Sequence, residues 1–528
     1  MERYLSTFLS PDAAEKAGCI EITRPLEDPL ITGFEFDSRK VRPGNLYCAL
    51  PGIHADGHDY IAEALQAGAR AILHQRPLDE YRKDTAYIRA ADSHFAMSPL
   101  ADAFYSYPSR RLAVIGVTGT EGKSTTVYLI YQLLKLLGKG AGFISTVRFS
   151  NGGEDEANPQ HQTTPEAPTV QRLLAEMVER GAEFAVVESS SHGLSSKTNR
   201  LGDVAFDAGI MTNVTHEHLE FHGTWEQYRS DKANLFRALE KAGHVKGGLE
   251  IPSFGVVNAD DPSAASFAAV LSRPCYTYSA RPGGNVDLSL LDIQSGAEGN
   301  RYRALAGETF GGCILEIEDR LPGAFNALNV LASLIAVSRI LPVPVEDLLP
   351  LIPRLKPVRG RMTAIDKGQD FEVLVDYAHT PSSFQTIFPP LRERIRKRGG
   401  RIISLFGSAG ERDTLKRPEQ GRIASQWSDI LVLTDEDPRG EDPMTILEEI
   451  AQGCGANQGC GANRGEDLFL IPHRPDAIRM AFSLARKGDL VLLLGKGHEN
   501  SIIYAGKTVD YDEIGEAERA LEEMGFAN

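Results

Sequence analysis

Short, uninterrupted apolar runs recur along the chain and alternate with helix-like segments. Residues 112–117 (LAVIGV), 184–189 (FAVVES) and 254–259 (FGVVNA) are such runs, and residues 226–242 have the pattern of a helix. A continuous apolar run of this length is typical of a strand buried on both faces of a parallel sheet. Strands of this kind separated by helices predict a wound α/β fold.

Two segments that combine proline with basic residues divide the chain. They are residues 105–111 (YSYPSRR) and 352–361 (IPRLKPVRGR), and both are typical of connections between domains. Short strand-like runs at 46–50 and 71–74 and a helix candidate at 60–67 precede the first segment. Four apolar runs (FEVLVDY, RIISLFG, DILVLTD and DLVLLLG) follow the second. We therefore predict three domains, at residues 1–108, 109–353 and 354–528, which suits a chain of 528 residues.

Composition excludes several classes of protein. The chain is 42% hydrophobic and 24% charged, so disorder and small disulfide scaffolds are excluded. Its 56 basic and 72 acidic residues give a net charge of −16, which argues against general nucleic-acid binding. No run approaches the roughly 18 apolar residues of a membrane helix, and no signal peptide is visible. Six scattered cysteines suit reduced thiols, so we expect a cytoplasmic protein with no membrane or nucleic-acid partner.

A tandem repeat of QGCGAN lies within residues 452–465. Its glycine and asparagine content predicts a flexible surface loop. Cys454 and Cys460 could instead form half of a metal site, although no second pair of cysteines lies near them in the sequence.

The strongest local signal is GVTGTEGKSTT at residues 116–126, between an apolar strand and a helix pattern. Glycines let backbone N–H groups approach phosphate oxygens, and the helix amino terminus favours negative charge. Lys123 would reach the outer phosphates, and the Ser124 hydroxyl would coordinate Mg²⁺. The strict pattern has glycine where Val117 stands, so the motif is a variant; the alternative is a glycine-rich turn with no ligand.

Further candidates follow along the chain. Glu188 ends an apolar strand, where a carboxylate suits a second Mg²⁺ contact, although an ordinary solvated glutamate is the commoner case. Residues 212–223 (TNVTHEHLEFHG) combine three histidines with two glutamates, which favours a divalent ion beside ATP over zinc. Lys232 falls on the apolar stripe of its helix, so its ammonium group points inward or snorkels along that stripe.

Together with TGTEGKSTT, nine further motifs occur in order: ESSSHGL, TNVTHEHLEFHG, NADDP, LPGAFNALN, VRGRM, VDYAHTP, GERDTLKRP, DEDPRGEDP and GKGHE. With DSRKVRPGNLYCALPG near the amino terminus, they resemble the Mur ligase family of ATP-dependent amide-bond-forming enzymes over essentially the whole chain. Within that family the chain looks most like the ligase that adds a diamino acid to UDP-N-acetylmuramoyl-L-alanyl-D-glutamate in peptidoglycan synthesis.

The resemblance implies an amino-terminal UDP-substrate-binding α/β domain, a central P-loop ATPase domain with a parallel sheet, and a carboxy-terminal Rossmann-like domain. It implies ATP and Mg²⁺ as cofactors, a UDP-N-acetylmuramoyl-dipeptide and a diamino acid as substrates, and a monomer. The substrate carboxylate would be phosphorylated by ATP, and the incoming amine would displace phosphate from the acyl phosphate. Because the sites lie on three domains, domain closure is expected.

The family's site residues carry over to matching positions. Catalytic residues would be Lys123, Glu188, His218 and Lys232, with Mg²⁺ held by Ser124, Glu188, His218 and a carbamylated Lys232. ATP would contact Gly119, Thr120, Glu121, Gly122, Lys123, Ser124, Thr125, Asn258, Asn326, Arg361, Asp376 and His379. The UDP-linked substrate would contact Phe36, Ser38, His54, Ala55, Asp56, Gln162, Thr163, Thr164, Ser190 and Arg200. The amino acid would contact Arg412, Glu436, Asp437, Pro438, Arg439, Gly495 and Glu499.

Departures from the family pattern bear on the third substrate. Gln162, Ala324 and Arg359 stand where the family usually has asparagine, arginine and proline. Members selective for meso-diaminopimelate typically carry Asp-Asn-Pro-Arg, and this chain has Glu436-Asp437-Pro438-Arg439. Added negative charge at Asp437 should favour a distal ammonium over a second carboxylate, which favours L-lysine or L-ornithine over meso-diaminopimelate.

Other interpretations are a sister ligase such as a folylpolyglutamate synthetase, a nucleotide-dependent switch and an inactive scaffold. The DSRKVRPG segment argues against the first of these. The lack of a guanine-reading motif at residues 258–261 argues against a GTP-dependent switch, and the intact Lys123 and Glu188 argue against a scaffold.

Overall fold

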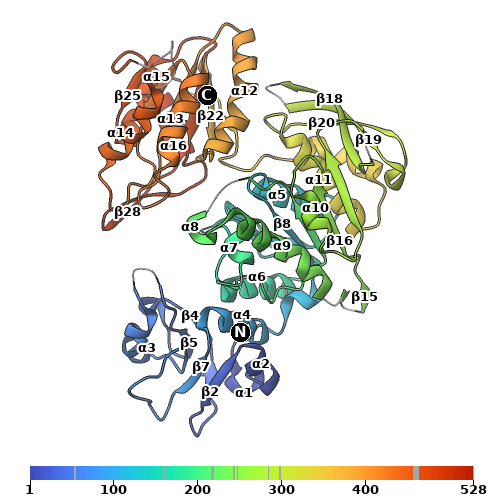
Figure 1. The fold of residues 1–528 in the computed structure, drawn as a ribbon, viewed down its shortest axis with the longest axis vertical. Coiled ribbons are helices and arrows are strands. Elements are labelled where there is room, and N and C mark those ends of the chain that lie inside the picture. The colour runs from blue at the N-terminus through green and yellow to red at the C-terminus, as the bar shows by residue number, and fades with distance from the viewer. Residues whose placement is uncertain are drawn as a thin grey trace.

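The computed structural model of the 528-residue chain describes residues 1–52, 55–158, 162–215, 219–241, 244–246, 248–283, 285–296, 299–455 and 463–526. Three successive α/β bodies follow one another along the long axis of the molecule, with the amino-terminal body at one end and the carboxy-terminal body at the other (Figure 1). Each body is built around its own sheet, as the sequence predicts. The exact boundaries at residues 108 and 353 stay a prediction.

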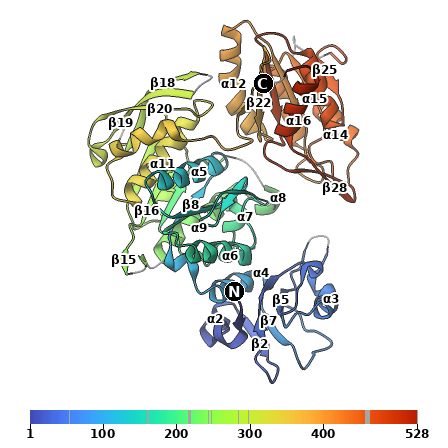
Figure 2. The same ribbon diagram turned by 180° about the vertical axis from the view of Figure 1, so that it is seen from behind.

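The amino-terminal body has a five-stranded sheet of order β2-β7-β6-β5-β4 in its described residues, with only β2 antiparallel. Its strands are β1 (Arg3–Tyr4), β2 (Cys19–Thr23), β3 (Leu30–Ile31), β4 (Gly33–Glu35), β5 (Asn45–Cys48), β6 (Ala71–His74) and β7 (Ala86–Ala90), and its helices are α1 (Leu5–Phe8), α2 (Pro11–Lys16), α3 (Ile61–Gln66) and α4 (Ser93–Phe104). Helix α4 is almost wholly buried because it packs on this sheet and also faces α6 of the central body (Figure 2).

The central body contains one large sheet, whose described strands follow the order β11-β10-β9-β12-β8-β13-β16-β17-β18-β19-β20. The strands are β8 (Ala113–Thr118), β9 (Ala141–Ile144), β10 (Arg148–Ser150), β11 (Glu156–Ala157), β12 (Phe184–Glu188), β13 (Ala208–Met211), β14 (Val245–Lys246), β15 (Leu249–Glu250), β16 (Phe254–Asn258), β17 (Cys275–Ser279), β18 (Leu288–Gly296), β19 (Gly299–Ala306) and β20 (Ile314–Asp319), of which β14 and β15 form a separate hairpin. The strands from β9 to β18 in that order pair in parallel, and both ends of the sheet are antiparallel.

Helices cover both faces of the central sheet. They are α5 (Lys123–Leu136), α6 (Ala167–Glu179), α7 (Ser191–Leu194), α8 (Leu219–His222), α9 (Trp225–Lys241), α10 (Ala264–Ala268) and α11 (Asn326–Ile340). Helices α5 and α11 share one apolar core with the sheet, and α6 and α9 share the other. The apolar runs of the sequence are therefore buried on both sides, as expected for parallel strands.

The carboxy-terminal body is doubly wound, with the sheet order β21-β22-β26-β23-β24-β25. Its strands are β21 (Thr363–Ile365), β22 (Glu372–Asp376), β23 (Ile402–Phe406), β24 (Ile430–Leu433), β25 (Leu468–Leu470), β26 (Leu490–Leu494), β27 (Ser501–Tyr504) and β28 (Lys507–Asp510), and its helices are α12 (Pro381–Lys397), α13 (Lys416–Trp427), α14 (Pro443–Cys454), α15 (Arg474–Leu484) and α16 (Glu513–Glu523). Helices α12 to α14 cover one face, and α15 and α16 cover the other. This arrangement agrees with the Rossmann-like expectation.

The structure corrects the prediction of a surface loop over the whole of residues 452–465. Helix α14 continues to Cys454, whose side chain is fully buried and whose Sγ lies 3.7 Å from the carbonyl oxygens of Gly421 and Ile450. A Cβ on Gly453 would lie 1.8 Å from the carbonyl oxygen of Pro418, so this glycine lets α14 approach α13 closely. Cys460 lies outside the described residues. None of the helices in the described part of the chain is long and apolar enough to cross a membrane.

Candidate active site

The phosphate-binding motif forms a tight loop between β8 and α5. Gly119 and Gly122 have positive φ angles, and a Cβ on Gly119 would lie 1.8 Å from Oγ1 of Thr212. Only glycine therefore fits the loop at residue 119. The loop is tied to the segment after β13, because Thr120 N donates to Asn213 O (2.8 Å) and Glu121 N donates to Asn213 Oδ1 (2.8 Å). Lys123, the first residue of α5, bends back so that Nζ donates to Thr120 O (2.7 Å).

Two residues expected to bind Mg²⁺ through oxygen, Ser124 and Glu188, lie side by side at the carboxyl end of the sheet. The Ser124 hydroxyl donates to Oε1 of Glu188 (3.0 Å), and Thr146 N donates to Oε2 of the same carboxylate (2.8 Å). Glu188 is 1% exposed, which excludes the interpretation of this residue as an ordinary solvated glutamate. A hydroxyl and a carboxylate are hard oxygen ligands of the kind that Mg²⁺ prefers, so the described residues fit that ion.

Lys232 points into the protein from α9 and reaches the phosphate loop. Its Nζ donates to Gly119 O (2.5 Å) and lies 4.6 Å from the centre of the Tyr228 ring. The residue is 2% exposed, so it does not snorkel to the surface. Carbamylation at this position would replace a buried ammonium with oxygen ligands beside the loop. His218, which the resemblance places at the same metal site, lies outside the described residues.

An open cleft of about 550 Å³ lies between the central and carboxy-terminal bodies. Six residues of the predicted ATP site line this cleft: Glu121, Gly122, Thr125, Asn326, Arg361 and Asp376. Phe325, Asn329, Met362, Ala378, Ser383, Thr386 and Ile387 also line it and were not predicted. Asn329 could have been found from the sequence, because it lies one helical turn after Asn326 on α11. In the structure its Nδ2 donates to Asn326 Oδ1 (2.9 Å).

The other six predicted nucleotide residues lie outside the lining of this cleft: Gly119, Thr120, Lys123 and Ser124 in the phosphate loop, and Asn258 and His379 elsewhere. Asn258 donates to Thr212 O (3.0 Å) at the end of β16, and His379 Nδ1 lies 2.9 Å from Tyr377 O. Within the cleft, burial raises the pKa of the Asp376 carboxyl, although the Arg361 charge and N–H groups of Ala378 and Met362 oppose that shift.

In the amino-terminal body, the predicted uridine-site residues surround α3 and the loop before it. Ser38 donates to Glu63 (3.1 Å), Phe36 is partly exposed, and Asp56 accepts from His58 N (2.9 Å). Ala55 adjoins Asp56, and His54 lies outside the described residues. A nearby hollow is lined by Glu35, Arg39, Lys40, Val41, Arg42 and Asn45. Its three basic side chains were missed, although the DSRKVR motif already contains them.

Three of the residues predicted to hold the muramoyl-peptide part are bonded to one another. Ser190 Oγ donates to Thr164 Oγ1 (2.9 Å), and Arg200 Nη1 donates to Thr164 O (3.0 Å). Arg200 also pairs with Glu166 at 2.5 Å. Gln162 and Thr163 precede Thr164 on the same loop. The structure therefore places Arg200 beside the other predicted residues of this group.

Six of the seven predicted amino-acid residues lie after the carboxyl ends of β24 and β26, and Arg412 follows β23. Lys496, which was not predicted, is fully buried and contacts Asp437 Oδ1 (2.9 Å) and Glu499 Oε2 (2.5 Å). Burial lowers the pKa of Lys496, but the charges of Glu499 and Asp437 outweigh it and raise that pKa. The added negative charge of Asp437 is therefore not isolated, because Asp437 shares the Lys496 ammonium group with Glu499.

Two other side chains at this end retain unused hydrogen-bonding atoms. Oε2 of Glu436 is buried and has no hydrogen-bond partner among the described residues, and it lies 3.3 Å from the position of a Cβ on Gly495. Nε of Arg439 is likewise buried without a partner in the described part of the chain. Arg439 has a φ of 56°, and its N–H donates to Ile503 O (2.9 Å). Pro438 lies between these groups, and Arg412 is exposed on the loop before α13.

The phosphate loop, the buried carboxylate at its strand end and the cleft beside a doubly wound domain define a nucleotide-binding enzyme class. Comparison with known proteins identifies the family. Family models match residues 30–105 (Mur ligase family, catalytic domain), 117–337 (Mur ligase middle domain) and 360–497 (Mur ligase, glutamate ligase domain). The chain belongs to the Mur ligase family.

Individual relatives span nearly the whole chain. A UDP-N-acetylmuramyl-tripeptide synthetase of Treponema denticola is 51% identical and covers 93% of this chain and 94% of its own length. A UDP-N-acetylmuramoyl-L-alanyl-D-glutamate–2,6-diaminopimelate ligase of Geobacillus kaustophilus is 36% identical, with coverages of 94% and 96%. A solved structure of a ligase with the latter description has a TM-score of 0.60 at 25% identity and covers 99% of this chain and 100% of that one. The protein is thus an ATP-dependent, amide-bond-forming Mur ligase of cell-wall synthesis.

Proposed function

We propose that this enzyme joins a diamino acid to UDP-N-acetylmuramoyl-L-alanyl-D-glutamate, with L-lysine or L-ornithine as the amino acid. The similarity to a tripeptide synthetase over 93% of the chain carries the proposal for the nucleotide substrate. The Glu436 carboxylate oxygen that lacks a hydrogen-bond partner among the described residues carries the proposal for the amino acid. We further expect a cytoplasmic monomer with ATP as the energy source.

The amino acid is best argued from charge. Asp437 and Glu499 share the ammonium group of Lys496, so two carboxylates are bridged by one cation. The unused Glu436 oxygen is a ready acceptor for a substrate ammonium group, because a buried acceptor without a partner gains a full hydrogen bond on binding. Arg439 supplies a guanidinium group for one carboxylate. A second carboxylate, as in meso-diaminopimelate, would lie near this excess of negative charge.

The chain's own residues suit each stage of the reaction. The backbone of residues 119–122 and Lys123 would hold the ATP phosphates, and Lys123 would neutralise charge that builds during transfer to the glutamyl carboxylate. Ser124, Glu188, His218 and a carbamylated Lys232 would hold Mg²⁺, which when bound supplies further neutralisation of the phosphoryl oxygens. The incoming amine then attacks the acyl carbon, and the C–O bond to phosphate breaks as inorganic phosphate leaves. Thr164, Ser190 and Arg200 would orient the acceptor peptide.

Phosphate release tests the proposal directly. The enzyme is supplied with ATP, Mg²⁺ and UDP-N-acetylmuramoyl-L-alanyl-D-glutamate, and with L-lysine, L-ornithine or meso-diaminopimelate in separate reactions. We expect turnover with L-lysine or L-ornithine and a product that gains the mass of one amino-acid residue. Turnover with meso-diaminopimelate alone would overturn the choice of amino acid. Absence of turnover in all three reactions, with ATP still bound, would favour a sister ligase of the same family.

A further inference from the structure

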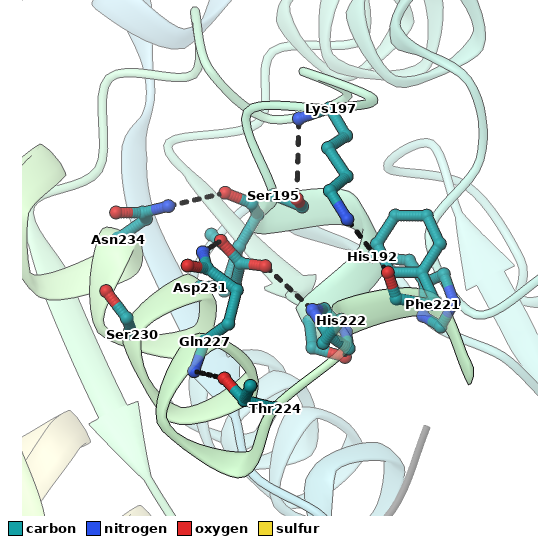
Figure 3. Close-up of polar contacts among 12 residues, drawn as sticks. His192, Ser195, Lys197, Phe221, His222, Thr224, Gln227, Ser230, Asp231 and Asn234 are labelled. Carbon is teal, nitrogen blue, oxygen red and sulfur yellow. Dashed lines mark hydrogen bonds and ion pairs between the residues drawn. The ribbon is translucent and has the colours of Figure 1, made fainter. Parts of the chain in front are cut away.

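The third histidine of residues 212–223, His222, is buried and connects two helices of the central body. His222 Nδ1 lies 2.7 Å from Oδ2 of Asp231, and its Nε2 lies 3.0 Å from the Ser191 hydroxyl. Figure 3 shows Asp231 reaching from α9 to the ring of His222. His222 is 4% exposed, and Ser191 and Asp231 are 2% exposed. A carboxylate only accepts hydrogen bonds, so Nδ1 carries the proton and Nε2 accepts the serine hydroxyl.

The order of these three side chains is that of a hydrolase triad, but their burial excludes that role. A nucleophilic serine must reach a substrate carbonyl group, and the Ser191 hydroxyl is enclosed at the start of α7. The Asp231 carboxylate is also bonded on its other oxygen, which accepts from Gln227 Nε2 (2.9 Å). The group is therefore a structural network whose function depends on what it holds in place.

Each end of the network is attached to a segment of the proposed metal site. Ser191 follows Glu188 by three residues, at the point where β12 gives way to α7. Asp231 immediately precedes Lys232 on α9. His222 itself ends α8, which begins directly after His218 in the sequence. One imidazole ring thus joins the three stretches of chain that carry Glu188, His218 and Lys232.

A second contact leads from His222 toward the phosphate loop. Its ring packs edge-on against Tyr228 with 5.2 Å between ring centres. The Tyr228 hydroxyl lies 3.0 Å from Thr120 Oγ1, and Lys232 Nζ lies over the same tyrosine ring. Displacement of His222 would therefore disturb Tyr228 and Lys232 together.

We propose that His222 is a positioning residue, which fixes α9 against the end of β12 so that Lys232 reaches the phosphate loop, to which Glu188 is bonded through Ser124. The inference rests on the proposed function in one respect, since it takes Lys232 to be carbamylated and to bind Mg²⁺. Residues that hold metal ligands in place typically contribute 10- to 100-fold to metal affinity or activity. The loss of both bonds of His222 should therefore act on the metal site rather than on the amino-acid site.

Three substitutions separate the two bonds. His222→Phe removes both while filling the space. His222→Asn places an amide N–H near the position of Nδ1 and can keep the bond to Asp231, whereas His222→Gln reaches toward Ser191. Asn234→Ala is the matched control, because Asn234 Nδ2 donates to Leu194 O (2.9 Å) and so joins α9 to α7 at a point separate from the His222 bonds (Figure 3).

The first readout is the ¹³C NMR signal of the carbamate in protein equilibrated with ¹³CO₂, assigned by its loss in Lys232→Arg. The second is the Mg²⁺ concentration at half-maximal phosphate release, measured beside KM for the amino acid. We expect His222→Phe to weaken the carbamate signal and to raise the Mg²⁺ requirement roughly 10-fold or more, with KM for the amino acid unchanged. His222→Asn should recover most of both properties, and His222→Gln less, because only the former keeps the bond beside Lys232.

Several outcomes would overturn the proposal. They are a wild-type signal and Mg²⁺ dependence in His222→Phe, equal losses in Asn234→Ala, and better recovery by glutamine than by asparagine. If His222→Phe does not fold, the asparagine and glutamine variants decide the matter by the same ranking. Absence of the carbamate signal in the wild-type enzyme would instead contradict the proposed role of Lys232, and the positioning proposal would fall with it.

Discussion

The phosphate loop and the amino-acid end of the site differ in how far their polar groups are already satisfied. Around the loop, Thr120, Glu121, Ser124 and Lys123 each have a hydrogen-bond partner within the central body. At the ends of β24 and β26, Glu436 and Arg439 retain buried atoms without partners among the described residues. The first region is preorganised by the protein, whereas the second lacks contacts that a substrate can supply.

This difference corresponds to a difference in task. A site that stabilises charge in a transition state works best when its donors are already fixed, because little reorganisation is then needed during the reaction. A site that selects one small molecule gains from polar groups that only the right substrate satisfies. We therefore expect substitutions at the loop to affect turnover and substitutions at Glu436 and Arg439 to affect selectivity.

The largest effect is expected at Lys123. Lys123→Met keeps the aliphatic stem but removes the charge beside the phosphates, and we expect phosphate release to fall roughly 10³-fold with little change in KM for the amino acid. Steady-state kinetics with saturating amino acid measures both. Lys135→Met on the exposed side of the same helix is the control and should keep wild-type rates. A loss confined to KM for the amino acid would contradict the division of tasks.

Glu436 should give the next largest effect. Glu436→Gln removes the charge but preserves the size of the side chain, and a hydrogen bond to a charged group contributes about 1.5–3 kcal/mol, or roughly 10- to 100-fold in KM for L-lysine or L-ornithine. ATP binding, measured by calorimetry, should not change. Glu448→Gln, exposed on α14 beside Arg464, is the matched control. An unchanged KM in Glu436→Gln would show that this oxygen does not bind the substrate.

Arg439 should affect selectivity through geometry. Lysine keeps the positive charge but cannot form two parallel bonds to a carboxylate, so Arg439→Lys should raise KM for the amino acid about 10-fold. The residue also has a φ of 56°, which both side chains tolerate equally poorly, so folding should be preserved. Thermal unfolding checks this point. A large drop in Tm with unchanged KM would assign Arg439 a structural role instead.

The two regions also differ in how well the sequence predicts them. The loop motif is contiguous, so its spacing alone predicts the strand, the glycine conformations and the place of Ser124, and Glu188 follows from its position at a strand end. The pairing of Asp437 with Lys496 could not be predicted, because it joins positions 59 residues apart whose contact depends on the order of β24 and β26 in the sheet. His222 is counted among the three histidines of residues 212–223, but its bonds to Asp231 and Ser191 could not be predicted, since they are fixed only when α7 and α9 pack together.

The smallest effect is expected where the sequence suggested a large one. Asp437→Asn restores the residue typical of meso-diaminopimelate enzymes, and charge counting alone predicts a marked change of selectivity. In the structure Lys496 pairs with both Asp437 (2.9 Å) and Glu499 (2.5 Å), so neutralising Asp437 should leave Lys496 with Glu499 as its partner. We therefore expect the ratio of kcat/KM values for L-lysine and meso-diaminopimelate to change less than about 5-fold, because the buried ammonium group of Lys496 is not left without a partner.

The double variant Glu436→Gln/Asp437→Asn sharpens the comparison. If Asp437 acts only through Lys496, the selectivity of the double variant should match that of Glu436→Gln alone, because the effects of substitutions at uncoupled sites are additive. A change well beyond the single variant would show that the two carboxylates form one negative site, and the selectivity would then reside in Asp437 after all.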